Sequence, residues 1–283
     1  MNRSDKIKLL LTRNWKFPGR ERLSRLLKPS MAFKYSSQNC ITWLNDEPLA
    51  IYTSPDSYIE WTILSTGTYE PEIEKLIALS LKEGDVALDI GANIGLQSLR
   101  MARCVGNSGQ VLAFEPLTHL QQKLKQNTLL NRLGNIRILP YALSDRENEL
   151  SYSINENAWN QGAFSLGQVQ TGNTEQSIQI KKGDLLPEIQ QLPKLDLIKI
   201  DVEGFEFPVL KGLQQTLEKF KPRLIFEYDQ NYWRNCQQDI DYCYQFLQEL
   251  NYTIYQIIPL GCHLLTRSDY IESGNLYCIC TDI

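Results

Sequence analysis

Three acidic residues, Asp201, Glu203 and Glu206, stand close together directly after an apolar run of the sequence. A carboxylate at such a position can remove a proton from a reacting hydroxyl group or bind a cation. Lys199 lies two residues before Asp201, and because side chains alternate along a strand, both point to the same side. The cluster predicts proton-transfer chemistry, and the alternative is an ion pair that only stabilises the turn.

A second pattern joins an apolar run to a helical stretch through Asp89-Ile90-Gly91-Ala92-Asn93-Ile94-Gly95. Gly91 has no Cβ to block a ligand, and Gly95 allows helix and strand to pack closely. Backbone N–H groups at such a helix start face the ligand in doubly wound sheets. A dinucleotide site has glycine at the middle position, where this chain has Asn93, so the spacing disfavours a nicotinamide cofactor.

Glu115 ends the next apolar run, 24 residues after Gly91. A carboxylate at this place can accept hydrogen bonds from both ribose hydroxyls of an adenosine. The cofactor that has an adenosine but no pyrophosphate, and an ammonium group that Asp89 can face, is S-adenosylmethionine. The alternative is that Glu115 caps the helix that follows it.

Other candidates for this cofactor site follow from the same sheet edge. Pro116 directly follows Glu115, and Ala142 and Leu143 end the third run, where the adenine ring would lie. Asp145 is placed to accept a hydrogen bond from the adenine amino group, and the alternative for Asp145 is an ordinary turn residue.

Apolar strand-like runs alternate with helical stretches from about residue 70, and this alternation predicts a doubly wound α/β domain with a mostly parallel sheet. The predicted strands cover residues 86–90, 111–114, 136–143, 195–200 and 223–228. The predicted helices cover residues 72–81, 96–104, 117–130, 207–219 and 239–250. Residues 145–183 are a polar insertion, and the runs 252–257 and 275–280 predict a closing antiparallel pair.

The first 66 residues are expected to form a separate extension before a main domain at 67–283. Residues 1–28 contain nine basic and two acidic side chains, a charge of +7, whereas the whole chain carries −4. They form either a solvated helical extension or an arm that touches an anionic membrane or a phosphorylated acceptor. Short β segments are predicted at 41–44, 49–52 and 58–64. Because the arm precedes the sheet, we expect deletion of 1–28 to leave cofactor affinity intact.

Composition narrows the class of protein. The chain has 283 residues, of which 42% are apolar, and its near-balanced charge argues against nucleic-acid binding. No run of 18 apolar residues spans a bilayer, and the N-terminus lacks a signal peptide. The seven cysteines are scattered without paired metal-ligand spacing, which is typical of reduced thiols in a cytoplasmic protein.

Four segments together resemble the FkbM-type class I methyltransferases: residues 84–95, 114–116, 142–145 and 196–206. The resemblance covers about residues 67–283, and Ile198-Lys199-Ile200-Asp201-Val202-Glu203-Gly204 is its most specific part. It implies O-methylation by S-adenosylmethionine, often of sugar or polyketide hydroxyls, on a seven-stranded sheet whose last strand is antiparallel. Glu70 resembles the Glu of the family's Tyr-Glu-Pro segment, which implies contact with the methionine part of the cofactor. The alternative for Glu70 is a helix N-cap.

An alcohol must lose its proton during attack on the methyl group, so a general base is expected. The candidates are Asp201, which also belongs to the predicted cofactor site, Glu203, Glu206 and His263. An isolated loop histidine is the alternative reading of His263. Asp201-Val202-Glu203-Gly204 stands where amine methyltransferases carry Asn/Asp-Pro-Pro-Tyr, which favours oxygen over nitrogen as the acceptor atom.

Several alternatives stay open at this stage. Asp201 and Glu227 could together bind Mg²⁺, although two or three oxygen ligands are few and a metal is not favoured. A set of aromatic residues lies in insertions and after strands, where they form an acceptor wall or pack in the core: Trp159, Phe164, Tyr228, Tyr232 and Trp233. The partner expected is a small-molecule or glycan hydroxyl. The rival functions are a nicotinamide-dependent oxidoreductase and a catalytically silent cofactor-binding module.

Overall fold

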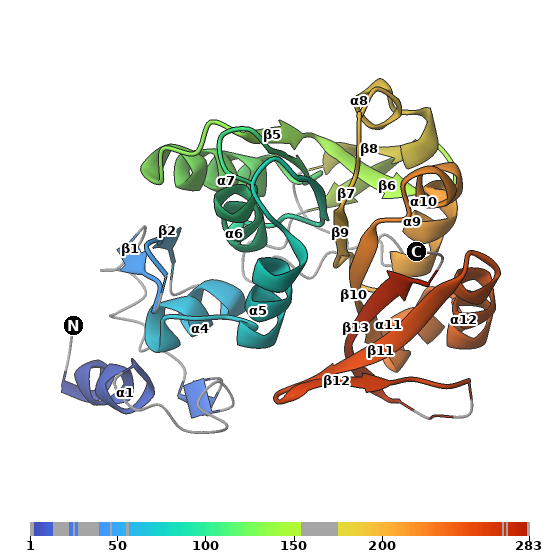
Figure 1. Ribbon diagram of the computed structural model, residues 1–283. Coiled ribbons are helices and arrows are strands. Elements are labelled where there is room, and N and C mark those ends of the chain that lie inside the picture. The colour runs from blue at the N-terminus through green and yellow to red at the C-terminus, as the bar shows by residue number, and fades with distance from the viewer. Residues whose placement is uncertain are drawn as a thin grey trace.

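The structure is a computed structural model that describes residues 3–13, 23–24, 26–27, 40–45, 47–54, 57–153, 175–267, 269 and 271–281 (Figure 1). Within these residues the centre is an eight-stranded sheet in the order β12-β11-β13-β10-β9-β3-β4-β5. In chain order its strands are β3 (Val86–Ile90), β4 (Gln110–Phe114), β5 (Ile136–Leu139), β9 (Leu197–Ile200), β10 (Arg223–Asp229), β11 (Tyr252–Ile258), β12 (Gly261–Leu264) and β13 (Ser273–Cys280).

The sheet is parallel from β5 to β10 and antiparallel at β13, which pairs with both β10 and β11. The predicted doubly wound α/β fold and the antiparallel closing pair are therefore confirmed. The chain adds one strand to the expected seven, because β12 folds back on β11 as an edge hairpin. All five residues of β3 are buried, as a continuous apolar run predicts for a central parallel strand.

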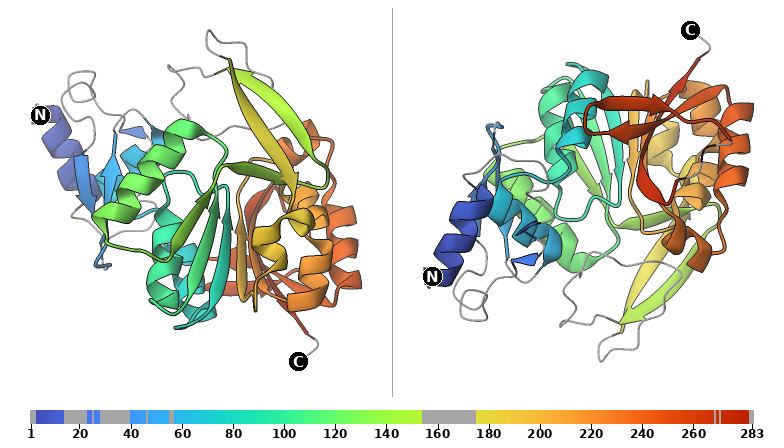
Figure 2. Two further views of the ribbon diagram at one scale, coloured as in Figure 1. Left: turned by 90° about the horizontal axis from the view of Figure 1, so that it is seen from above. Right: turned by 90° about the horizontal axis from the view of Figure 1, so that it is seen from below.

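Helices cover both faces of the sheet, and Figure 2 shows them on either side of it. One face is covered by α5 (Pro71–Ser80), α6 (Leu96–Val105) and α7 (Thr118–Leu130), and the other by α9 (Glu206–Gly212), α10 (Gln214–Phe220) and α12 (Ile240–Glu249). Alternate strand residues serve the two faces: Ala87 packs with α5 and α6, whereas Leu88 packs with α9 and α12. The remaining short helices are η1 (Gly183–Leu185), α8 (Pro187–Gln190) and α11 (Gln230–Asn235).

Two predicted elements are each split in two. The predicted strand 136–143 forms β5 and β6 (Tyr141–Ser144), with Pro140 between them, because proline cannot donate to a sheet ladder. The predicted helix 207–219 forms α9 and α10, which meet at Leu213. β6 leaves the main sheet for a second one with β8 (Glu175–Lys182) and β7 (Asn148–Ser153), both from the polar insertion. Trp159 and Phe164 lie outside the described residues.

The N-terminal part contains α1 (Arg3–Arg13), the antiparallel pair β1 (Cys40–Trp43) and β2 (Ala50–Thr53), and α4 (Tyr58–Thr66). The prediction of a β segment at 58–64 is wrong, because this stretch is the helix α4. Its β-branched residues Thr62, Ile63 and Thr66 are buried by tertiary packing, and the two threonines each donate to the carbonyl oxygen four residues earlier. Gly67, with φ of 76°, then ends the helix in the left-handed conformation.

Within the described ranges, no helix combines the length and the apolar character that crossing a bilayer requires.

Candidate active site

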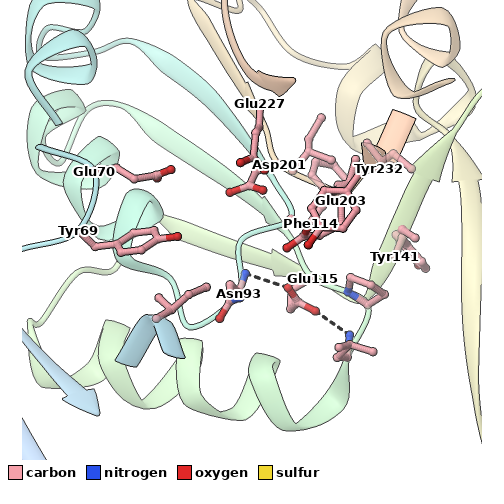
Figure 3. A pocket seen from close by; sticks show the side chains of 18 of the residues that line it. Tyr69, Glu70, Asn93, Phe114, Glu115, Tyr141, Asp201, Glu203, Glu227 and Tyr232 are labelled. Carbon is pink, nitrogen blue, oxygen red and sulfur yellow. Dashed lines mark hydrogen bonds between the residues drawn. The ribbon is translucent and has the colours of Figure 1, made fainter. Parts of the chain in front are cut away.

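A cavity of about 280 Å³ opens at the carboxyl ends of the central strands. The loops after β3, β4 and β9 form its walls, together with β6, the end of β10, α11, the first turn of α4 and the segment before α5 (Figure 3). Ligands of doubly wound sheets bind at this edge. Nine of the sequence-predicted residues line it: Glu70, Gly91, Asn93, Glu115, Pro116, Ala142, Leu143, Asp201 and Glu203.

The glycine turn after β3 is shaped by close backbone contacts. Gly91 has φ of 83°, and a Cβ there would lie 1.9 Å from the carbonyl oxygen of Asp201. Gly91 is therefore required by the approach of the neighbouring loop, in addition to its place at the cavity. Gly95, also at positive φ, does not line the cavity, and its missing Cβ leaves room for Leu124 of α7.

Glu115 is buried at the end of β4 and joins two loops of the cavity. Its Oε2 accepts from the backbone N–H of Asn93 at 2.8 Å, and its Oε1 accepts from that of Leu117 at 2.8 Å (Figure 3). Burial raises the pKa of Glu115 to about 7. Each carboxylate oxygen has a second lone pair, so Glu115 can hold its backbone partners and still accept from a ligand hydroxyl.

Carboxylates gather on the opposite wall of the cavity. Asp201 follows β9, Glu203 lies two residues later, Glu227 belongs to β10, and Glu70 precedes α5 (Figure 3). Burial and the charge of Asp201 raise the pKa of Glu203 to about 8. Burial and the charges of Asp201 and Glu203 also raise the pKa of Glu227. The acids thus raise one another's proton affinity, as expected where carboxylates outnumber the cations beside them.

Lys199 is the cation behind this cluster. Its Nζ lies 2.9 Å from Oδ2 of Asp201 and 4.0 Å from Oδ1 of Asp89. Burial alone would lower the pKa of Lys199, but Asp201, Asp89 and Glu70 together raise it, so the side chain stays charged. The ion pair predicted as an alternative is present between Lys199 and Asp201, and the charge of Lys199 only partly offsets the rise in the pKa of Glu203.

Comparison with known proteins gives the family. The Methyltransferase FkbM domain matches residues 89–254, which include the glycine turn, Glu115 and the acidic cluster. The chain belongs to the FkbM methyltransferase family. The predicted enzyme class, a methyltransferase, is confirmed with it.

This FkbM methyltransferase is 33% identical over 153 residues to the hexuronic acid methyltransferase AglP of Haloferax volcanii, covering 53% of the chain and 58% of that protein. It is 30% identical over 164 residues to the methyltransferase sdnD of Sordaria araneosa, covering 48% of the chain and 63% of that protein. The match therefore spans less than two thirds of the length of either relative. A crystal structure of methyltransferase FkbM from Methylobacillus flagellatus aligns with a TM-score of 0.44 and 16% identity over 78% of this chain and 53% of that one.

Five predicted site residues of the FkbM methyltransferase lie away from the cavity: Asp89, Gly95, Asp145, Glu206 and His263. Asp89 is fully buried beneath the glycine turn, where it accepts from Ser98 Oγ rather than facing the cavity. His263 is exposed on β12, because the edge hairpin carries it away from the strand ends.

Asp145 and Glu206 are held by other partners. Lys211 Nζ lies 2.8 Å from Oδ2 of Asp145. Burial alone would raise the pKa of Asp145, but the contact with Lys211 lowers it. Glu206 accepts from the backbone N–H groups of Val202 at 2.9 Å and Gly204 at 3.1 Å. It thereby fixes the turn that carries Asp201 and Glu203 toward the cavity.

The sequence reasoning missed several aromatic residues of the cavity wall: Tyr58, Tyr69 and Tyr141. Tyr58 was predicted to begin a β segment, and nothing local shows that α4 reaches the strand ends. Tyr232 lines the cavity and hydrogen-bonds Glu203, whereas Tyr228 and Trp233 are buried in the core. In the described part of the chain, no group of three or more His, Cys, Asp or Glu side chains is arranged to hold a metal ion.

Proposed function

We propose that this FkbM methyltransferase transfers a methyl group from S-adenosylmethionine to a hydroxyl group of an uncharged carbohydrate or secondary metabolite. The observation that carries the proposal is the cavity itself, which has Glu115 on one wall and the acidic cluster of Asp201, Glu203 and Glu227 on the other. Glu115 suits the ribose of an adenosine. The acidic cluster suits a cation next to a hydroxyl that must lose a proton.

The chain's own residues fit the methyl donor. Glu115 would accept from the ribose hydroxyls, with Ala142 and Leu143 beside the adenine ring. Glu70, on the far wall, would accept from the ammonium group. S-adenosylmethionine carries two positive groups against one carboxylate, so a cavity with excess acids suits its charge. When bound, it supplies an electrophilic methyl group on a sulfonium, which an oxygen nucleophile attacks in line.

Glu203 is the base that the geometry favours. Of the four candidates, only Asp201 and Glu203 line the cavity, and Asp201 is engaged by Lys199. A group whose pKa is raised to about 8 is matched to proton removal near neutral pH. Tyr232, which hydrogen-bonds Glu203, would hold this carboxylate toward the acceptor.

The charge of the cavity bears on the acceptor. Among the residues that the structure describes, the lining includes Glu70, Asp201, Glu203 and Glu227 but no lysine or arginine. In their ionised form these acids would repel a carboxylate on the acceptor, whereas a neutral hydroxyl can donate to them. The relative AglP is named for hexuronic acid, so we propose a carbohydrate-type acceptor that differs from it in charge.

The test is mass spectrometry of products formed with methyl-labelled S-adenosylmethionine and matched pairs of neutral glycosides and uronides. We expect the label on a hydroxyl oxygen of a neutral acceptor and a strong loss of labelling in Glu203→Gln. Calorimetry with S-adenosylhomocysteine and with NAD⁺ separates the rival functions. Binding of NAD⁺ alone would support an oxidoreductase, and binding of S-adenosylhomocysteine without turnover of any acceptor would support a silent binding module.

A further inference from the structure

The segment that connects α4 to α5 has an unusual backbone. Gly67 has φ of 76°, and Glu70 has φ of 52° and ψ of 61°, directly before Pro71. A left-handed conformation is costly for a residue other than glycine and persists only where neighbouring groups hold it. Glu70 and Tyr69 of this segment both line the cavity, so their placement depends on what holds the segment.

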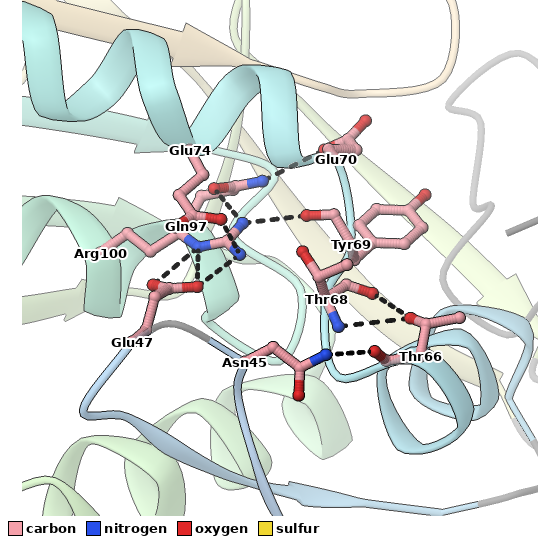
Figure 4. A network of polar contacts seen from close by, with 9 residues as sticks. All are labelled: Asn45, Glu47, Thr66, Thr68, Tyr69, Glu70, Glu74, Gln97 and Arg100. Carbon is pink, nitrogen blue, oxygen red and sulfur yellow. Dashed lines mark hydrogen bonds and ion pairs between the residues drawn. The ribbon is translucent and has the colours of Figure 1, made fainter. Parts of the chain in front are cut away.

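Arg100 of α6 is the centre of the polar network around this segment (Figure 4). Its side chain is only 2% exposed, and all five of its N–H donors have acceptors. Nε and Nη2 donate to the carboxylate of Glu47, at 3.1 and 2.7 Å, and Nη2 also donates to Glu74. Nη1 donates to the carbonyl oxygen of Tyr69 at 2.9 Å, which ties the connecting segment to α6.

Gln97 carries the network on to the cavity. Its Oε1 accepts from Nη1 of Arg100 at 3.3 Å, which fixes the orientation of the amide. The Nε2 group must then face the other way, and it donates to Oε2 of Glu70 at 3.2 Å (Figure 4). Glu70 is a hydrogen-bonding neighbour of Asn275 as well, so Gln97 provides part of its support.

Asn45, which lies between β1 and β2, holds the same segment at a second place. Nδ2 of Asn45 donates to the carbonyl oxygen of Thr66 at 2.7 Å. The backbone N–H of Asn45 donates to the carbonyl oxygen of Gly67, also at 2.7 Å. A Cβ on Gly67 would lie 2.4 Å from Oδ1 of Asn45, so the two chains are in close contact. Glu47, two residues after Asn45, supplies the carboxylate that pairs with Arg100.

We propose that Glu47 and Arg100 are positioning residues for Glu70, so that Glu47, between β1 and β2, helps to build the methyl-donor site. Neither side chain lines the cavity. Glu47 orients the guanidinium, Arg100 orients the amide of Gln97 and the backbone of Tyr69, and Gln97 holds the carboxylate of Glu70. The effect on affinity for S-adenosylhomocysteine rests on the proposed function. The effect on the backbone around Glu70, measured by hydrogen exchange, does not depend on that function.

The experiment is a double-mutant cycle of Glu47→Gln and Glu70→Gln, read by calorimetry with S-adenosylhomocysteine. We expect Glu47→Gln to weaken binding about fivefold in the wild-type background and to have almost no effect in the Glu70→Gln background. An equal loss in both backgrounds would show that Glu47 does not act through Glu70, and would overturn the proposal. Glu188→Gln is the matched control, because it removes the carboxylate of another Arg–Glu pair, with Arg137 at 2.9 Å, and should leave affinity unchanged.

Hydrogen exchange of the protein without ligand gives the second readout. The amides of Ile73 and Glu74 both donate to the carbonyl oxygen of Glu70, so they report on its placement. We expect at least tenfold faster exchange of these amides in Glu47→Gln and no change in Glu188→Gln. Unchanged protection in Glu47→Gln would overturn the positioning role, whereas failure of the wild type to bind S-adenosylhomocysteine would overturn only the proposed function.

Discussion

Glu115 shows how one buried carboxylate can serve both the fold and the ligand. It is 4% exposed, and its two oxygens hold the N–H groups of Asn93 and Leu117, on either side of the cavity floor. The sequence left two readings open for this residue, a ribose ligand and a helix cap. The contacts are compatible with both, because the backbone bonds use only one lone pair of each oxygen.

We predict that Glu115→Ala weakens binding of S-adenosylhomocysteine by about 2 kcal/mol, the scale of hydrogen bonds lost to a charged group. Calorimetry measures this change. The melting temperature should fall as well, because two backbone N–H groups lose their acceptor. Glu115→Gln, which keeps the shape, is the control, and unchanged affinity in both variants would remove Glu115 from the site.

The pH dependence should report Glu203. Its pKa is raised from 4.5 in the unfolded chain to about 8 in the folded one, so the folded chain binds more protons between these values. The free energy of unfolding should therefore fall as the pH rises through this window. Turnover should rise over the upper part of the same range, because a base must be ionised to act.

Rate profiles from pH 6 to 9 and denaturant unfolding over pH 4 to 9, each with wild type and Glu203→Gln, check this prediction. The variant should lose the rising limb of the rate and part of the decline in stability. A wild-type rate that does not change across this range would exclude Glu203 as the base.

Between elements, α7 uses asparagine side chains to complete the edge of β2. Asn127 accepts from the backbone N–H of Tyr52 at 2.7 Å and donates to the carbonyl oxygen of Ile94 at 2.8 Å. Asn131, one helical turn later, accepts from and donates to the backbone of Ala50. The two side chains share a helix face because they are four residues apart. Asn127 thereby connects the N-terminal strand pair to the glycine turn.

We predict that Asn127→Ala lowers the free energy of unfolding by about 1–3 kcal/mol, because Asn127 is fully buried and its loss leaves two backbone groups unpaired. Asn131→Ala, at a partly buried position, should cost less. Denaturant unfolding of the two variants measures the difference. Equal losses would mean that the link to the glycine turn contributes nothing beyond the pairing with β2.

For the whole molecule, the N-terminal part is tied to the wall of the cavity through α4. The indole Nε1 of Trp61 donates to the carbonyl oxygen of Ser24 at 3.1 Å, and Arg13 donates to that of Leu64 at 3.0 Å. Tyr58 and Ile59, at the start of the same helix, line the cavity. These contacts change the expectation that deletion of residues 1–28 leaves cofactor affinity intact.

We now predict that this deletion lowers the melting temperature and weakens binding of S-adenosylhomocysteine, because Trp61 loses a buried hydrogen bond worth about 1–3 kcal/mol. Thermal unfolding and calorimetry measure the two effects, with Arg13→Ala as a smaller change in the same contact. If both quantities stay at wild-type values, residues 1–28 are the separate extension first expected. The division of the chain at residue 66 stays a prediction.

Where prediction from sequence succeeded, the signal was local. The central strands are mostly apolar, with one charged residue in β3 and one in β9, and the limits 86–90 predicted for the first agree with those of β3. Where prediction failed, the deciding partner was distant. The stretch 58–64 has β-branched residues that suit a strand, yet burial against other elements and the stop at Gly67 make it helical.

Local residue patterns were enough to predict the doubly wound sheet, the glycine turn after its first strand and the positions of Glu115 and Asp201, because apolar periodicity and strand-end motifs lie in neighbouring residues. Which acids face the cavity depends on contacts between distant parts of the chain. Lys211 engages Asp145, two backbone N–H groups engage Glu206, and the edge hairpin carries His263 away. The direction of a polar side chain depends on partners far along the chain, and residue spacing does not encode them.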